Sequence, residues 1–238
     1  AKTGREQLDA LKTFIERQNL ITVPESEPVV VAPTPEFYRW SFASMWTPGP
    51  FESKPTRAYY YLTDVDPHWP EERQLEHLRD YNLATLWSVS VHEVYPGHFL
   101  HYQHLRKVTS KARKSILFAS ASFVEGWAHY SEQMVLDEGY SKDPKMKLGQ
   151  LQDALLRNAR YICGIEMHTG KKTFDQCVEF FEKEGYQTHE VSMRETMRGT
   201  SDPTYLYYTL GKLQILKLRK DYKAKRGEGF SLAEFHDS

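Results

Sequence analysis

The sequence has few of the features that mark several large classes of protein. It contains two cysteines among 238 residues, Cys163 and Cys177, and no CxxC pair. A disulfide framework and a cysteine metal clip are therefore excluded, and we expect both thiols to be small buried side chains. No run of about 18 apolar residues exists to cross a membrane, so we expect no membrane span.

An excess of charge of either sign is also absent. Lys and Arg together number 31 and Asp and Glu 32, which gives a net charge of −1. Without a basic tail or block, a nucleic-acid partner is not expected. The first 14 residues lack the apolar region of a signal peptide, but a signal removed earlier would leave no trace. The sequence therefore leaves the compartment open.

What the chain does have is a composition able to form a core. It is 40% hydrophobic and 13% aromatic, enough for one large domain or two small ones. Apolar residues recur at helical spacing through most of the chain. The predicted helices cover 3–20, 71–95, 112–137, 144–167, 173–184, 189–197 and 203–225. Pro70, just before the second of these, is a good first helical residue.

Extended structure is predicted only near the N-terminus. Residues 27–35 form a short β-branched run closed by prolines, which is typical of an edge strand, and 57–65 is a second strand candidate. Residues 37–46 are compatible with a short helix or an aromatic loop, and 47–55 is a loop by composition. We predict a mainly α single domain, residues 1–238, with a small β element in its N-terminal third.

The candidate metal ligands are concentrated in a histidine cluster. Residues 88–104 hold His92, His98, His101 and His104, four of the ten histidines in the chain. Zinc binds neutral imidazoles and carboxylates, and catalytic sites keep one position open. A cluster of this kind is also compatible with a surface metal scavenger, a structural metal, or a solvated face with no metal. For His101 and His104 we expect surface positions or contacts that support the others.

His92 and His98 are six positions apart, which is wrong for an uninterrupted helix. Six residues rotate by about 600°, so the two rings would point about 120° apart. Pro96 and Gly97 stand between them. Proline removes a helical hydrogen bond and glycine adopts backbone angles that other residues avoid. We therefore expect a local bulge that swings His98 back towards His92.

Carboxylates near the cluster complete a candidate site. Glu93 directly follows His92, a position in which a glutamate takes a proton from an activated water. Glu125 and Glu132 are seven apart and share a helix face. We favour Glu125 as the third ligand, with Glu132 as the alternative or as a partner that orients an imidazole. His129 on the same face serves either such support or plain packing.

A hydrolytic site also needs a donor to the oxyanion of the transition state. The segment 198–212 is rich in suitable groups, and packing is the competing interpretation for them. The candidates are Arg198, Tyr205, Tyr207 and Tyr208, with Arg160 and His168 as weaker ones.

Three segments together resemble one family. "HEVYPGH" (92–98), "EGWAHYSE" (125–132) and "GTSDPTYLYYTLGK" (199–212) match motifs of the bacterial family called domain of unknown function 885 (DUF885), which looks like a distant branch of the helical zinc metallopeptidases. The resemblance covers essentially the whole chain. His101 stands where the family usually has Gln, His129 where an apolar residue is usual, and the third motif lacks its usual Pro-Gly-Gln.

The resemblance implies a site and a fold. It implies His92, His98 and Glu125 as ligands of Zn²⁺, Glu93 as general base and Tyr208 as an oxyanion or substrate contact. It also implies a helical zinc-metallopeptidase-like fold and a peptide substrate.

Family members are typically much longer. We therefore expect the chain to be a C-terminal catalytic fragment, with a missing N-terminal half that completes the cleft. The competing functions are a non-catalytic metal- or peptide-binding module and another metallohydrolase, such as an amidase or esterase.

Overall fold

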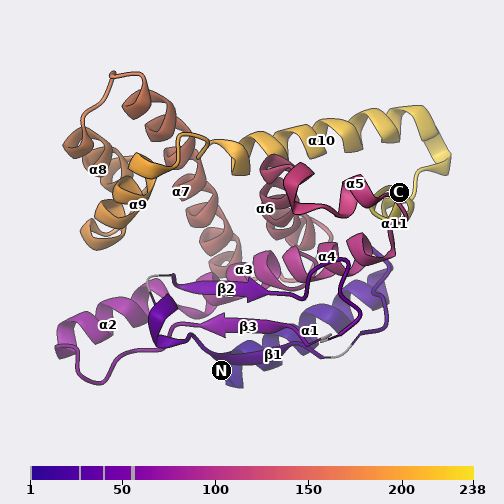
Figure 1. Ribbon diagram of the computed structural model, residues 1–238, viewed down its shortest axis with the longest axis horizontal. Helices are drawn as coiled ribbons and strands as arrows, with labels where there is room; N and C mark the ends of the chain where they lie inside the picture. The colour runs from indigo at the N-terminus through magenta and orange to yellow at the C-terminus, as the bar shows by residue number, and fades with distance from the viewer. Residues whose placement is uncertain (1, 27, 40, 55–56) are drawn as a thin grey trace.

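The computed structural model describes residues 2–26, 28–39, 41–54 and 57–238. Within these ranges the protein is mainly helical, with one small sheet in the N-terminal third, as predicted (Figure 1). Glu27, Trp40 and Pro55, which belong to three of the predicted N-terminal segments, lie outside the described residues.

The N-terminal third combines one helix with three short strands. Its elements are α1 (Lys2–Gln18), β1 (Val30–Pro33), the 3₁₀ helix η1 (Glu36–Tyr38), β2 (Ala43–Trp46) and β3 (Tyr59–Leu62). The strand order is β1-β3-β2, with β1 parallel and β2 antiparallel to β3. The edge strand and the second strand are thereby confirmed.

The interpretation of 37–46 as a short helix or loop is wrong in its second half. Residues 43–46 form β2, which pairs with β3 and places the Trp46 ring edge-on to Tyr61 at 5.8 Å. The strand has no β-branched residue, so its extended form depends on its neighbour in the sheet and not on local preference.

The predicted helix 71–95 is wrong as a single element. It is divided into α2 (Glu71–Asp80) and α3 (Leu83–Glu93), and Pro70 stands just before the first helical residue. Asn82 causes the division, because its side chain accepts hydrogen bonds from the backbone amides of Ala84 and Thr85. An asparagine in this position caps a new helix.

The predicted helix 112–137 is likewise divided. It begins as the single turn α5 (Lys111–Lys114), passes through η2 (Ile116–Phe118) and resumes as α6 (Ala121–Asp137). Ser115 and Ser120 stand at the breaks, and each side-chain oxygen accepts a backbone N–H of the next segment. Serine therefore ends one element and starts the next.

The C-terminal half consists of helices. They are α7 (Pro144–His168), α8 (Phe174–Lys183), α9 (His189–Ser201), α10 (Tyr207–Arg226), the 3₁₀ helix η3 (Gly227–Gly229) and the unpredicted α11 (Leu232–Asp237). Helix α7 runs from α3 to the hairpin of α8 and α9, while α10 crosses above α6 (Figure 1). The predicted helices 144–167, 173–184, 189–197 and 203–225 match these within a few residues.

The core holds α6 and α10 unusually close together. A Cβ on Gly126 would lie 2.4 Å from the backbone of Gly211, and a Cβ on Gly211 would lie 1.7 Å from the Ser122 carbonyl oxygen. Only glycine fits at either position, because any side chain would collide with the facing backbone. This contact presses the start of α10 against the helix that carries Glu125 and Glu132.

The expectation that both cysteines are buried is confirmed. Cys163 and Cys177 are both buried free thiols, packed with Ala159 and Phe181 between α7 and α8. Among the described residues, no helix is both long and apolar enough to cross a bilayer.

Candidate metal centre

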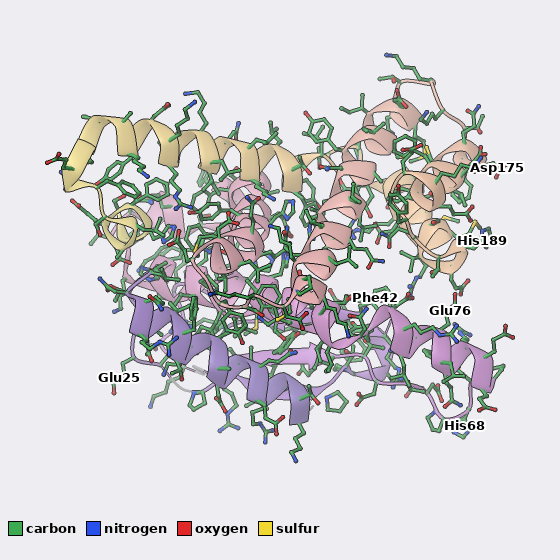
Figure 2. All side chains as sticks on the ribbon, turned by 180° about the vertical axis from the view of Figure 1, so that it is seen from behind. Glu25, Phe42, His68, Glu76, Asp175 and His189 are labelled. Atoms are coloured by element: carbon green, nitrogen blue, oxygen red, sulfur yellow. The ribbon has the colours of Figure 1, made fainter. Side chains whose placement is uncertain are left out.

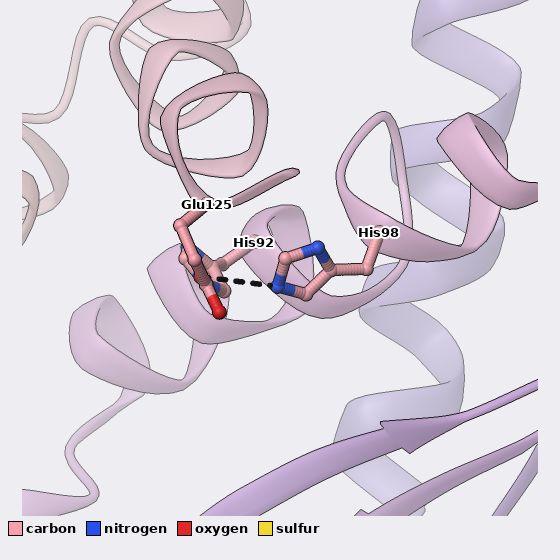
Figure 3. A group of neighbouring side chains, drawn as sticks. All are labelled: His92, His98 and Glu125. Atoms are coloured by element: carbon pink, nitrogen blue, oxygen red, sulfur yellow. Dashed lines mark ion pairs between the residues drawn. The ribbon is translucent and has the colours of Figure 1, made fainter. Parts of the chain in front are cut away.

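Three helices meet at the histidine cluster. His92 lies in the last turn of α3, His98 is the first residue of α4 (His98–Lys107), and Glu125 lies in the second turn of α6 (Figure 3). The link between α3 and α4 is four residues long and contains a cis Tyr95–Pro96 peptide bond. The helix therefore stops and restarts between the two histidines.

Gly97 makes this link possible. Its amide donates to the Val91 carbonyl oxygen at 2.9 Å, which folds the link tightly against the end of α3. A Cβ at Gly97 would lie 1.8 Å from the carbonyl oxygen of His92, far inside any allowed contact. The backbone of the link can pass His92 only because residue 97 has no side chain.

The result is the convergence expected from the Pro-Gly break. The His92 and His98 rings lie 4.7 Å apart between centroids, at 85° to each other. Glu125 Oε2 is 3.3 Å from His92 Nε2 and 3.4 Å from His98 Nε2 (Figure 3). One potential ligand atom from each of the three residues lies within 4.8 Å of the other two.

Glu125 Oε2 is buried and has no properly oriented hydrogen-bond donor among the described residues. An orphaned buried oxygen is costly and calls for an explanation. Burial by itself would raise the pKa of Glu125, but His98 and His92 hold it well below its usual value. A carboxylate facing two imidazole nitrogens in this way could hold a cation.

Glu132 occupies the other side of the His92 ring. Its side chain is fully buried, and its Oε1 lies 2.7 Å from His92 Nδ1 and 2.7 Å from Arg157 Nη2. His129 Nδ1 lies 3.1 Å from the second oxygen. Burial would raise the pKa of Glu132, but Arg157 and His129 lower it far below the usual value. Glu132 is therefore an ionised partner for His92 and lies outside the three-residue cluster.

The two glutamates also control the charge of His92. Burial would lower the pKa of this imidazole, but the nearby carboxylates of Glu125 and Glu132 outweigh burial and raise the pKa to about 9. His129 shows the opposite balance, because burial dominates over Glu132 and lowers its pKa to about 4. His129 is neutral near pH 7 and supports Glu132 from α6 itself.

A cavity of about 900 Å³ opens beside this cluster. Its lining includes His92, Glu93 and Tyr208, together with residues of α2, α7 and α9. Figure 2 shows Phe42, another lining residue, on the sheet side and facing the α8–α9 hairpin. The Arg194 guanidinium from α9 stacks 4.2 Å from the centre of that ring. The cavity therefore lies between the sheet side and the hairpin.

The remaining predicted residues fall into two groups. Glu93 and Tyr208 line the cavity with His92, and the Tyr208 ring centroid is 6.3 Å from that of His92. By contrast, His104 bonds the Thr22 carbonyl oxygen at 2.7 Å and His168 bonds that of Gly199 at 2.8 Å. These two histidines therefore have structural contacts away from the site.

His101 is not among the residues that line the cavity. It packs edge-on against Phe123 at 5.2 Å, and burial lowers its pKa to about 4. Neither His101 nor His104 belongs to the three-residue cluster.

Sequence reasoning missed Arg157. This buried arginine of α7 pairs with Glu132 and so connects a fourth helix to the site. The signal available was its spacing of three residues from Arg160, which places two arginines on one face of a long helix. Arg160 is also buried and lines the cavity, bonded to Glu195 of α9.

The fold and the site together define a mainly helical protein in which two histidines and one glutamate meet beside a large cavity. The chain belongs to the family described as bacterial protein of unknown function (DUF885), whose family model matches residues 1–238. No curated protein matches the chain.

Two solved structures are similar to the chain over nearly all of its length. A proposed lipoprotein of unknown function from Shewanella oneidensis has 30% identity and a TM-score of 0.86, covering 98% of this chain and 41% of that one. A proposed lipoprotein from Colwellia psychrerythraea has 27% identity and a TM-score of 0.76, covering 98% and 39%. The chain therefore spans about two fifths of the length of these structures.

Proposed function

We propose that this protein is a zinc-dependent peptidase with its metal held by His92, His98 and Glu125. The observation that carries the proposal is the convergence of their three ligand atoms within 4.8 Å. Two imidazoles and one carboxylate form a known donor set for catalytic zinc, which leaves a fourth position open. We also propose that the helical frame is a zinc-metallopeptidase-like fold.

The distances between the ligand atoms support a zinc ion with tetrahedral coordination. Donor atoms about 2.0–2.2 Å from a tetrahedral centre lie about 3.3–3.6 Å from one another. The two contacts from Glu125 Oε2 measure 3.3 and 3.4 Å. The same oxygen lacks a properly oriented hydrogen-bond donor among the described residues, and coordination to a bound cation would satisfy it instead.

Glu132 supports the proposal by fixing one tautomer of His92. Because its ionised carboxylate accepts from Nδ1 at 2.7 Å, the proton of neutral His92 belongs on Nδ1. The lone pair of Nε2 is then left to face Glu125 and His98. Imidazoles that bind metal commonly have such a carboxylate behind them. Arg157 and His129 hold Glu132 in place for this role.

The proposed reaction divides between the ion and the residues around it. Zinc in such a site supplies a Lewis acid that polarises a carbonyl and makes water a nucleophile near neutral pH. Glu93 takes a proton from the attacking water and delivers it to the leaving amine. Tyr208 donates a hydrogen bond to the oxyanion that develops on the peptide carbonyl. The cavity that both residues line would hold the peptide.

The wider setting of the protein is part of the proposal. Because the two similar structures are more than twice as long, we propose that further segments of a longer protein complete the cleft. Both are proposed lipoproteins, so we also propose that this longer protein is exported.

The test is Glu93→Gln, assayed against a peptide library with zinc content measured in parallel. We expect the variant to retain one zinc per chain and to lose cleavage by at least about a hundredfold, the contribution of a general base. Glu72→Gln is the matched control, because Glu72 is exposed on α2 and does not line the cavity. Equal cleavage by wild type and Glu93→Gln would refute the role of Glu93.

A result of zinc binding without turnover would instead favour a non-catalytic metal- or peptide-binding module. Turnover of esters or simple amides without turnover of peptides would favour another metallohydrolase.

A further inference from the structure

Next to Tyr208, one part of the cavity wall places two arginines, Arg160 and Arg198, beside one glutamate, Glu195. Arg160 of α7 holds both oxygens of Glu195, with Nε to Oε2 at 2.5 Å and Nη2 to Oε1 at 2.8 Å. The Tyr205 hydroxyl donates to Oε2 at 2.5 Å as well. Both oxygens of Glu195 are therefore occupied by hydrogen bonds from Arg160 and Tyr205.

Arg198 is the second arginine. Glu195 acts on it only at longer range, and among the described residues no carboxylate forms an ion pair with it. It lies one turn after Glu195 on α9, with its guanidinium carbon 5.1 Å from the centre of the Tyr205 ring. Its Nη2 donates to the Tyr208 hydroxyl at 3.1 Å. The side chain is half-buried and lines the cavity.

The charges of Arg160, Arg198 and Glu195 do not balance. Two guanidinium groups share one carboxylate, and that carboxylate is fully used by Arg160. A partly desolvated cation without a counter-ion is unfavourable, and it is a favourable place for an anionic ligand group. Arg157, in the same cavity, differs because it has Glu132 at 2.7 Å.

Tyr208 lies between Arg198 and the candidate metal centre. Tyr208 touches the Arg198 guanidinium with its hydroxyl, while its ring lies 6.3 Å from the His92 ring. A group bound by Arg198 is therefore separated from a carbonyl bound at His92, His98 and Glu125 by about the length of one tyrosine side chain. Because an extended residue spans only about 3.3–3.6 Å, one or two residues cover such a separation.

We propose that Arg198 binds the C-terminal carboxylate of the substrate, so that the protein is a carboxypeptidase that releases the last one or two residues of short peptides. This assignment rests on the proposed peptidase function. A planar guanidinium matches a carboxylate with two parallel hydrogen bonds, and one negative charge balances the excess positive charge of the group formed by Arg160, Arg198 and Glu195. Hydrolysis adds one water across the terminal peptide bond and leaves a new carboxylate and a free amine.

The test compares one short peptide as its free acid and as its C-terminal amide. We expect wild type to cleave the acid with a kcat/KM about 10- to 100-fold higher, the range of a charge-assisted hydrogen bond. Arg198→Met should remove this preference, so that kcat/KM for the acid falls by that factor more than kcat/KM for the amide does. Arg198→Lys should restore part of the preference because it keeps the charge.

Arg194→Met is the matched control. Arg194 lies one turn earlier on the same helix and lines the same cavity, but stacks on Phe42. We expect it to keep the preference for the acid. Equal cleavage of acid and amide by wild type, or an equal loss of both in Arg198→Met with zinc retained, would overturn the assignment.

A binding measurement separates this assignment from the peptidase proposal. In the Glu93→Gln variant, calorimetry should detect the acid with at least about tenfold higher affinity than the amide. Adding Arg198→Met should abolish that difference. If wild type cleaves no peptide but this binding difference is found, the peptidase proposal fails and the carboxylate site stands. Equal binding of the acid and the amide to Glu93→Gln would overturn the carboxylate site.

Discussion

Glu125 and Glu132 lie two turns apart on the same face of α6, and both contact the ring of His92, yet their surroundings differ. Glu132 on the Nδ1 side is fully buried and bonded by His92, His129 and Arg157. Glu125 on the Nε2 side has an oxygen without a properly oriented donor. Glu132, whose oxygens have hydrogen-bond partners, positions the ring. Glu125, which has an oxygen without a donor, is left available to bind a metal ion.

The largest effect that sharpens this comparison is expected from Glu125→Gln. The amide keeps the shape of the side chain but removes the charge that faces both imidazoles. We expect zinc affinity to fall by more than about a hundredfold, beyond the loss typical of residues that only support a ligand. Competition with a chromophoric chelator measures this affinity. An affinity within tenfold of wild type would remove Glu125 from the proposed ligand set.

Gly97→Ala tests whether the site depends on the link between α3 and α4. The new methyl group would lie 1.8 Å from the His92 carbonyl oxygen, so the link must move and carry His98 away. We expect a loss of zinc affinity approaching that of Glu125→Gln and a fall of about 2–4 kcal/mol in the free energy of unfolding. Gly229→Ala is the matched control, because a methyl group there meets no atom within 4 Å. Wild-type zinc affinity in Gly97→Ala would contradict this account of the link.

Glu132→Gln should weaken zinc binding less but destabilise the fold more. Support residues of this type contribute about 10- to 100-fold in metal affinity. The substitution also leaves Arg157 buried without its counter-ion, which costs about 3–5 kcal/mol. Urea unfolding of the metal-free proteins should therefore rank Glu132→Gln well below Glu125→Gln in stability. The reverse ranking would contradict the division of roles between the two glutamates.

The smallest effect is expected from His129→Leu. At pH 7 it removes one 3.1 Å contact to Glu132, so we expect a loss of about 1 kcal/mol and zinc affinity within a few-fold. The pKa of His129 is about 4 in the fold and about 6.5 when unfolded, so the unfolded chain binds more protons as pH falls. Wild type therefore loses stability from about pH 6.5 to pH 4.

His129→Leu should lose less stability than wild type over that interval. Unfolding curves of both metal-free proteins at several pH values measure the difference. Parallel pH dependence of the two proteins would show that His129 does not stay neutral in the fold.

Much of this site followed from local sequence rules. The break at Pro96 and Gly97 follows from steric properties of two residues, and so does the return of His98 towards His92. Gly126 permits the close approach of α10 for a similar steric reason. The starts of α3 and α6, which were missed, were also predictable from local rules, because Asn82 and Ser120 are typical capping residues.

Contacts between distant segments could not be obtained in this way. Sequence spacing left Glu125 and Glu132 as alternative ligands, because the choice depends on which nitrogen of His92 each one meets. That pairing is set by the packing of α6 against α3, about 40 residues away along the chain. The strand β2 and the Arg157 pair with Glu132 are decided by partners from other segments in the same manner.

The most direct test of the central claim is elemental analysis of wild-type protein purified without added metal. The account predicts one zinc per chain, lost on chelation and restored by added zinc to the same stoichiometry. Absence of any stoichiometric divalent metal, both as purified and after zinc is offered in excess, would contradict it.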